Sequence, residues 1–248
     1  MTLGETAVAG IRAWYRTFAS AGSEVREFAS AQALLTTARP ERSLLNAVVY
    51  SDPRDVALDE LPAFFEPVQA WCVWVHPGDD ELADRCAARG MVVDGTPMQM
   101  GARLADVDIA QRSVPAEIAE GAWPDVAVIN DAAYGFPAEH FAPVMRRLAT
   151  DGYRLAVARR DGAALACAGA VVQDANAHVV FVATLPDARR QGLAAECMRT
   201  VLRAAADDGA VTTTLEASAA GEGIYAAMGY ESLGRYRMME ARGTAADS

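Results

Sequence analysis

Residues 179–194 read VVFVATLPDARRQGLA, and this stretch decides the fold. It begins as an apolar run typical of a buried strand, turns at Pro186, and continues as a basic loop that opens a helix. Unpaired N–H groups and the helix dipole make such a helix N-terminus favourable for an anion. Gly192 lets a ligand approach the backbone closely, and Arg189 and Arg190 add cationic donors. The stretch therefore predicts a pyrophosphate site.

The loop differs from the common nucleotide-binding loops. It does not end in the Lys-Ser/Thr of a Walker A loop and has no Gly-x-Gly-x-x-Gly fingerprint, which disfavours nucleoside triphosphates and NAD as ligands. The structural alternative is an ordinary strand–turn–helix junction, in which the arginines are solvated and Gly192 only serves the turn.

Two motifs resemble the signatures of the GNAT superfamily of N-acetyltransferases. Arg189-x-x-Gly192-x-Ala194 resembles the Gln/Arg-x-x-Gly-x-Gly/Ala signature of that family. Residues 215–218 and 224–230, LEAS and IYAAMGY, look like its later strand, helix and Tyr-x-x-x-Gly-Phe/Tyr ending. Both motifs occur in the family's order and at its spacing, and the resemblance covers about residues 106–240. It implies an acetyl-CoA N-acyltransferase-like fold and acetyl-CoA as co-substrate.

The resemblance also implies which residues bind acetyl-CoA. The strand ending at Thr184 is expected to splay from its neighbour, so that its backbone holds the pantetheine and stabilises the oxyanion. The following loop is expected to wrap the pyrophosphate. The expected cofactor-binding residues are Val182, Ala183, Thr184, Arg189, Arg190, Gln191, Gly192, Leu193 and Ala194.

Two residues are candidates for proton transfer. Tyr225 matches the family's tyrosine that protonates the departing CoA thiolate, and its alternative role is that of a core aromatic. Glu216, at the end of a strand beside the expected cleft, is the candidate base; as an alternative it is solvated or structural, with a water relay removing the proton. Asn130 and Tyr134 lie between the two helices that wall the acceptor site in this fold. Either these two residues and Asp131 contact the substrate, or they cap the helix and pack the turn.

Strands and helices alternate along the whole chain, which predicts an α/β fold with a mixed α+β sheet. The expected helices cover 2–19, 58–65, 79–88, 124–134, 137–150, 190–206 and 222–228. The expected strands cover 44–50, 70–76, 98–104, 153–159, 163–172, 177–184, 211–217 and 233–240, with short strands near Met91 and after residue 108.

A weak internal repeat suggests two tandem units. Gly90 precedes Met100 by the interval that separates Gly229 from Met239, within similar strand–helix–strand patterns. We expect a degenerate GNAT-like domain at 1–105, a catalytic GNAT domain at 106–240 and a flexible tail at 241–248. The first unit has Cys86 in the place of Tyr225 and no comparable loop, so one active site is expected. The alternative is two αβ units that merely look alike. Trp71, Trp74 and His76 either line the acceptor pocket or belong to the core.

Composition bounds the partners. The net charge of −11 argues against nucleic acid and anionic membranes and suits an amine-bearing partner. Four scattered cysteines and three histidines support neither a metal site nor a disulfide framework. The sequence has no recognisable signal peptide and no spanning apolar run, so a cytoplasmic protein is expected. A homodimer is compatible with the sequence.

The predicted function is acetyl transfer from acetyl-CoA to the amine of a small-molecule acceptor, by direct attack on the thioester. The alternatives are a non-catalytic acyl-CoA sensor or scaffold and, third, a protein-lysine acetyltransferase. The sequence does not name the acceptor or fix the acyl chain length, because fold does not determine substrate.

Overall fold

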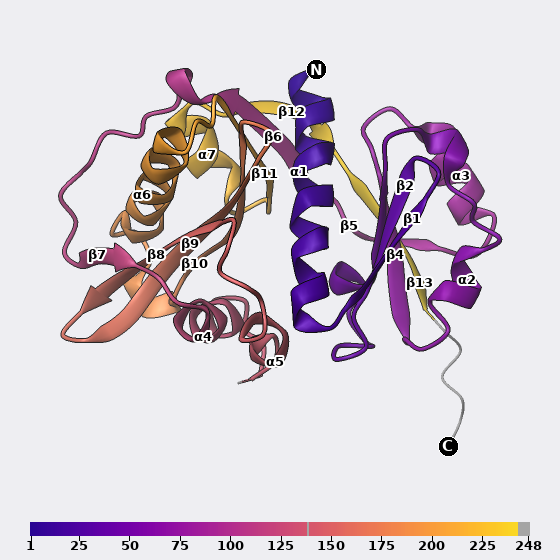
Figure 1. The fold of residues 1–248 in the computed structure, drawn as a ribbon, viewed down its shortest axis with the longest axis horizontal. Helices are drawn as coiled ribbons and strands as arrows, with labels where there is room; N and C mark the ends of the chain where they lie inside the picture. The colour runs from indigo at the N-terminus through magenta and orange to yellow at the C-terminus, as the bar shows by residue number, and fades with distance from the viewer. Residues whose placement is uncertain (138, 243–248) are drawn as a thin grey trace.

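The computed structural model describes residues 1–137 and 139–242, so most of the predicted tail lies outside the described residues. These residues form two α/β units, each built on its own mixed sheet, and helix α1 (Leu3–Thr17) stands between the units (Figure 1). The predicted mixed α/β fold is therefore confirmed. No helix in the described ranges is long and apolar enough to cross a membrane.

The first unit is a six-stranded sheet with the order β1-β2-β3-β4-β13-β5. Helices α2 and α3 cover the face turned away from α1, where Leu61, Phe65 and Leu82 are almost fully buried (Figure 1). The elements from the first half of the chain are β1 (Glu24–Phe28), β2 (Ala31–Leu35), β3 (Ala47–Tyr50), α2 (Leu61–Phe64), β4 (Ala70–Val75), α3 (Asp80–Ala87) and β5 (Val92–Gly95).

The second unit is a seven-stranded sheet with the order β12-β6-β11-β10-β9-β8-β7. Helices α6 and α7 cover one face, while α1, α4 and α5 cover the other. The elements are β6 (Met98–Arg103), β7 (Glu117–Glu120), α4 (Trp123–Ala133), α5 (Ala142–Met145), β8 (Tyr153–Arg160), β9 (Ala163–Gln173), β10 (Asn176–Thr184), α6 (Leu193–Asp207), β11 (Thr212–Ala217), α7 (Glu222–Met228) and β12 (Glu231–Arg235).

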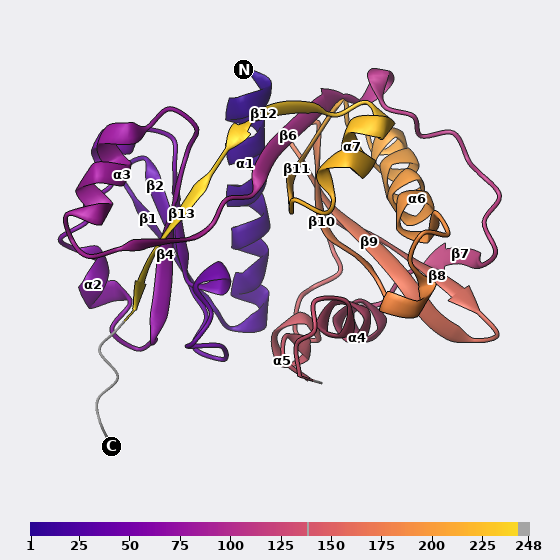
Figure 2. The same cartoon turned by 180° about the vertical axis from the view of Figure 1, so that it is seen from behind.

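The two units exchange strands. β6, from the first half of the chain, lies between β11 and β12, whereas β13 (Arg237–Arg242), at its end, lies between β4 and β5 (Figure 2). Met100 is paired with Leu215 and Met239 with Val73, both in antiparallel register. The methionines of the sequence repeat therefore lie on the two exchanged strands: β6 joins the sheet of the second unit, and β13 joins the sheet of the first.

The prediction of one continuous strand at 233–240 is wrong. The chain leaves β12 at Arg235 and enters β13 at Arg237, and the two strands belong to different sheets. Fully buried Tyr236 forms the crossing, where its N–H donates to the Pro97 carbonyl at 3.0 Å. Gly234, with φ of 118°, lies at the irregularity just before it. An apolar pattern cannot reveal this break, because both strands alternate in the same way.

Three other elements differ from the sequence prediction. The hairpin β1–β2 falls in a region for which no strand was expected. The helices expected at 58–65 and 137–150 shrink to α2 and α5, of four residues each, with a proline in the first turn of each. A proline is tolerated there, but the residue before it disfavours helical backbone, which prevents a longer N-terminal extension.

Helix α1 links the cores of the two units. Its capping box, in which Glu5 N–H donates to Thr2 Oγ1 at 3.2 Å and Thr2 N–H donates to Glu5 Oε2 at 2.7 Å, fixes the start. Ile11 and Trp14 are buried in a core that takes residues from both sheets. The helix therefore holds the sheets at a fixed separation, and the site lies beside it.

Candidate active site

The central feature of the second sheet is a gap between β10 and β11. Their parallel pairing extends only from Asn176–Thr212 to His178–Thr214, although β10 continues to Thr184 and β11 to Ala217. On its other side β10 stays paired with β9 through a bulge between Val180 and Ala183. The splay expected from the resemblance is thus present, and it leaves the β11-facing edge of β10 without a strand partner over its last residues.

A strained residue shapes the bulge. Phe181 has a φ of +55°, in the left-handed region that side chains other than glycine rarely adopt. The Cys167 thiol donates to its carbonyl at 3.2 Å, and the ring packs edge-on against Trp14 and Trp123. These contacts hold the bulge in place and turn the following backbone, from Val182 to Thr184, along the gap.

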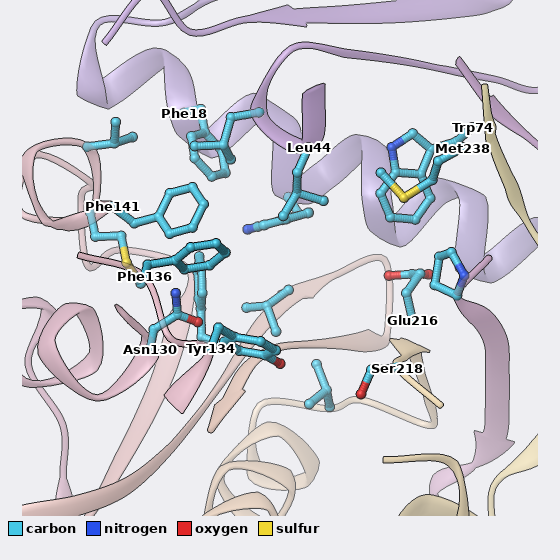
Figure 3. Close-up of a pocket in the computed structure, with 18 of the residues that line it drawn as sticks. Phe18, Leu44, Trp74, Asn130, Tyr134, Phe136, Phe141, Glu216, Ser218 and Met238 are labelled. Carbon is cyan, nitrogen blue, oxygen red and sulfur yellow. The ribbon is translucent and has the colours of Figure 1, made fainter. Parts of the chain in front are cut away.

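A cavity of about 520 Å³ lies next to this gap, between the second sheet, α1 and α4. Both units line it, so the first unit completes the site (Figure 3). The lining residues include Trp14, Phe18, Leu44, Leu45, Trp74, Thr96 and Pro97 from the first half, and Asn130, Tyr134, Phe136, Phe141, Phe181, Glu216, Ser218, Arg235 and Met238 from the second.

Glu216, predicted as the base, lies at the cavity wall near the end of β11 (Figure 3). Its side chain is 10% exposed, and its Oε2 lies 3.2 Å from Nε2 of His178, which is 1% exposed. Within the described chain its Oε1 has no hydrogen-bond partner. One carboxylate oxygen is thus held near a buried imidazole while the other is free to accept a proton or a hydrogen bond.

His178 was missed by sequence reasoning, and it belongs to a ladder of polar side chains on one face of two strands. Asn176 Nδ2 donates to Thr214 Oγ1 at 2.9 Å, and Thr214 Oγ1 lies 3.1 Å from His178 Nδ1. When the threonine hydroxyl donates to Nδ1, the imidazole proton is on Nε2 and faces Glu216. The period-two spacing of Thr212, Thr214 and Glu216 is the signal that could have indicated this ladder.

Tyr225, the predicted acid, lies on α7, on the opposite face of the sheet from α1. The residue is 9% exposed, and its ring packs near Tyr230 and over Gly221. Burial raises the pKa of Tyr225 well above its ordinary value, and the nearby Tyr134 raises it further. The phenol therefore stays protonated at neutral pH, as a proton donor must.

The loop before α6 has an open helix N-terminus. Gly192 is in the left-handed conformation with φ of 74°, and the structure gives α6 no side-chain cap. A Cβ added at Gly192 would meet only Val114, at 3.6 Å, so the backbone is accessible. The first N–H groups of the helix are consequently available to an anion. These features fit a bound diphosphate.

The arginines of the loop differ in their roles. Arg189 donates to the Ala133 carbonyl at 2.7 Å and to the Thr184 carbonyl at 3.4 Å, which ties the loop to the end of α4. Arg190 is exposed, with φ of +62°. Gln191 accepts a hydrogen bond from Arg160. The structure therefore brings a further cation, Arg160, to the loop. The sequence had indicated only the cations within the loop, Arg189 and Arg190.

The remaining cofactor-binding candidates are backbone positions. Ala183 is buried and Val182 and Thr184 are half-buried, on the strand beside the gap. Leu193 is 1% exposed and its side chain belongs to the core, so that only its N–H faces the loop, and Ala194 is half-buried in the first turn of α6.

The predicted acceptor wall is part of the cavity. Asn130 and Tyr134 both line it. The neighbouring Asp131 instead accepts the Phe141 N–H with both oxygens, at 3.1 Å each, which is a structural role. Asp131 therefore fixes the turn that places Phe141 in the cavity.

Of the three aromatic candidates in the first unit, only Trp74 lines the cavity. Trp71 stacks on Phe65 in the core of the first sheet, with ring centroids 4.8 Å apart. His76 stacks on Tyr50 at 4.0 Å. All four cysteines are buried and free, and across 1–137 and 139–242 no group of three or more His, Cys, Asp or Glu side chains could hold a metal.

Comparisons with known proteins agree with this geometry. The family described as an acetyltransferase (GNAT) domain matches residues 130–241, from within α4 to β13. A GCN5-related N-acetyltransferase from Kribbella flavida is similar in structure, with a TM-score of 0.68 and 20% identity over 97% of each chain. One from Sphaerobacter thermophilus gives a TM-score of 0.61 and 14% identity over 86% of this chain and 76% of that chain.

A tandem GNAT protein from the clavulanic acid biosynthesis pathway is similar over both units. Its TM-score is 0.56, with 14% identity over 98% of this chain and 97% of that chain. No curated protein sequence matches the chain. The family match includes both the open helix N-terminus at Gly192 and the splayed strands, which leads to one conclusion: residues 130–241 of this chain form a domain of the acetyltransferase (GNAT) family.

Proposed function

We propose that the protein transfers the acetyl group of acetyl-CoA to the amine of a small molecule by direct attack on the thioester. The observation that carries this proposal is the gap between β10 and β11, which lies between the α6 loop and a cavity containing a free carboxylate oxygen. A thioester placed in the gap would face an amine in the cavity. Holding both reactants together supplies much of the rate, because a bimolecular step becomes effectively unimolecular.

The α6 N-terminus is proposed to bind the diphosphate of acetyl-CoA. The N–H groups from Gly192 to Ala194 would donate to it, with Arg190 and Arg160 as nearby cations. Arg189 is a positioning residue in this account, since its guanidinium already holds the loop to α4. The edge of β10 between Val182 and Thr184 would hold the pantetheine by backbone hydrogen bonds, as an added strand would.

Glu216 is proposed as the base. Its free Oε1 accepts a proton from the ammonium form of the substrate, and the neutral amine nitrogen then attacks the thioester carbon. Negative charge develops on the thioester oxygen, where backbone N–H donors of the β10 edge stabilise it. As the C–S bond breaks, the CoA sulfur takes a proton from Tyr225. The amide nitrogen gives up its remaining extra proton, which reprotonates the Tyr225 phenolate through solvent, and Glu216 releases its proton to solvent. The products are the acetylated amine and free CoA thiol.

Thiol release and mass spectrometry of the acetylated product test the proposal with a panel of amines. Glu216→Gln should lower kcat by roughly 100-fold, the scale of general base catalysis, while the affinity for CoA is unchanged. Tight CoA binding without transfer to any amine would instead favour an acyl-CoA sensor. A cavity lined by both units supports a small acceptor over a protein side chain, which would need an open groove.

A further inference from the structure

We infer that the acceptor is a primary amine with a bulky apolar body and no anionic group. This inference rests on the proposed acetyl transfer. The inference comes from the chemistry of the cavity wall. A pocket that is mostly apolar, with a few placed polar groups, selects a ligand by matching both features.

Aromatic rings make up one side of the cavity. Phe136 packs edge-on against Phe141 with centroids 5.1 Å apart, and Trp14 packs edge-on against both Phe18 and Phe181. These rings are fixed against one another, so the cavity holds its shape before a ligand enters. Ring faces and edges of this kind favour an aromatic or branched aliphatic body over a polyhydroxylated one, because hydroxyl groups would lose their hydrogen bonds to water there.

Only two charged side chains, Glu216 and Arg235, line the cavity in the described part of the chain. Arg235 is already engaged, since it donates to Glu222 Oε2 at 2.8 Å and to the Thr96 carbonyl at 3.1 Å. The uncompensated charge is therefore that of Glu216. An ammonium group would find a partner there, whereas a carboxylate on the substrate would be desolvated beside a like charge.

The positions of these groups define how the amine lies. Glu216 and Ser218 stand on the β11 side, across the cavity from Phe136 and Phe141 (Figure 3). An amine whose nitrogen is at Glu216 would extend its apolar body toward the phenylalanines. Asn130 supplies an amide beside those rings for one neutral polar substituent (Figure 3). The matching class is arylalkylamines and branched alkylamines rather than amino acids, polyamines or amino sugars.

Four matched amines test this class in the acetyl-CoA assay: 2-phenylethylamine, phenylalanine, methylamine and spermidine. We expect kcat/KM for 2-phenylethylamine to exceed that for methylamine by at least about 100-fold, because each added methylene in an apolar pocket is worth roughly tenfold. Phenylalanine differs from 2-phenylethylamine by one carboxylate and should be poorer by about 100-fold or more, given the unpaired buried charge. Preference for phenylalanine or spermidine would overturn the inference and leave acetyl transfer intact.

A cavity-filling variant ties the preference to this site. Leu44 lines the cavity and is 36% exposed, so Leu44→Trp can be accommodated, whereas Val128 is 56% exposed on α4 and does not line it. Leu44→Trp should lower kcat/KM for 2-phenylethylamine at least tenfold more than kcat/KM for methylamine, and Val128→Trp should change neither. Equal effects of both variants would place the amine elsewhere and contradict the inference.

Direct binding separates this inference from the proposed function. Calorimetry with 2-phenylethylamine and CoA-saturated protein should detect binding in the wild type and weaker binding in Leu44→Trp. Absence of binding overturns the acceptor class. Binding without turnover on any amine retains the acceptor class and overturns the proposed catalysis instead.

Discussion

His178 Nε2 lies 3.2 Å from Glu216 Oε2, across the point where strands β10 and β11 separate after the His178–Thr214 pair. The contact is close but is not aligned as a hydrogen bond in the free protein. Such contacts commonly tighten when the reactants bind. Gly10 of α1 makes this packing possible, because a Cβ there would lie 2.5 Å from His178 Nδ1.

The first prediction concerns His178 as a positioning residue. His178→Leu should lower kcat by about 10- to 100-fold, comparable to the loss of an outer-shell partner of a site residue, since Glu216 would lose its fixed orientation. His178→Gln, which retains a donor, should recover part of that loss. The affinity for CoA should be unchanged in both variants. Equal losses in the two variants, together with reduced thermal stability, would assign His178 a merely structural role.

Tyr225 gives a prediction about pH. Because burial raises its pKa above the ordinary value of 10.0, the protonated phenol persists at higher pH than a free tyrosine. The profile of kcat should therefore show no alkaline fall from this group up to about pH 10. Tyr225→Phe should reduce kcat by roughly 100-fold with CoA affinity retained. An unchanged rate in Tyr225→Phe would remove the residue from the mechanism.

Local features of the structure could be predicted from the sequence. The boundaries of α7 match those expected at 222–228, and Gly229 ends it with a left-handed φ of 107°. The loop-to-helix transition was also expected here, but α6 begins at Leu193, three residues later than predicted, with Gly192 immediately before it. These features depend on backbone conformations and apolar periods within a few residues of sequence, which is the range over which sequence patterns carry information.

The features that were missed depend on contacts between distant residues. Arg112 N–H donates to Glu196 at 3.0 Å, so the face of α6 that an amphipathic pattern makes polar is partly buried under another segment. His178 acquires its partners, Thr214 and Glu216, only once β10 and β11 pair. The exchange of β6 and β13 is likewise a matter of strand pairing, which alternation of apolar residues does not specify.

The strand exchange makes the two units dependent on each other. A chain of residues 106–248 lacks β6, which lies between β11 and β12 in the sheet. We expect that this fragment shows no cooperative unfolding transition when urea unfolding is followed by circular dichroism. Co-expression with residues 1–105 should restore a soluble complex, because the exchanged strands can then pair. A monomeric 106–248 fragment with one sharp unfolding transition would contradict this dependence. It would mean that the domain predicted to start at residue 106 folds on its own.

His76 gives a prediction about stability. Burial lowers its pKa from 6.5 to about 4, with Asp79 opposing the shift. The unfolded chain therefore takes up a proton as the pH falls below 6.5 while the folded chain does not, so stability is lost between about pH 6.5 and 4. The loss from this group is at most about 3 kcal/mol.

Urea unfolding at pH 7.5 and 4.5 of the wild type and His76→Phe measures this contribution. The phenylalanine ring can retain the stack on Tyr50 but cannot be protonated. The variant should lose less stability than the wild type over that interval. His140, whose pKa is also lowered by burial and by Arg42 and Arg39, remains in both proteins and cancels in the comparison. Identical losses would exclude His76 as the source.

The most direct test of the account is the affinity for coenzyme A, measured by calorimetry with glycine variants at the two ends of α6. Gly192 and Gly209 are both exposed with left-handed φ, 74° and 92°, but only Gly192 lies at the N-terminus. We predict that the wild type and Gly209→Asp bind coenzyme A similarly, and that Gly192→Asp, which adds a negative charge at the proposed diphosphate site, binds at least about 10-fold more weakly. No affinity in the wild type, or equal affinity in all three proteins, would contradict the account.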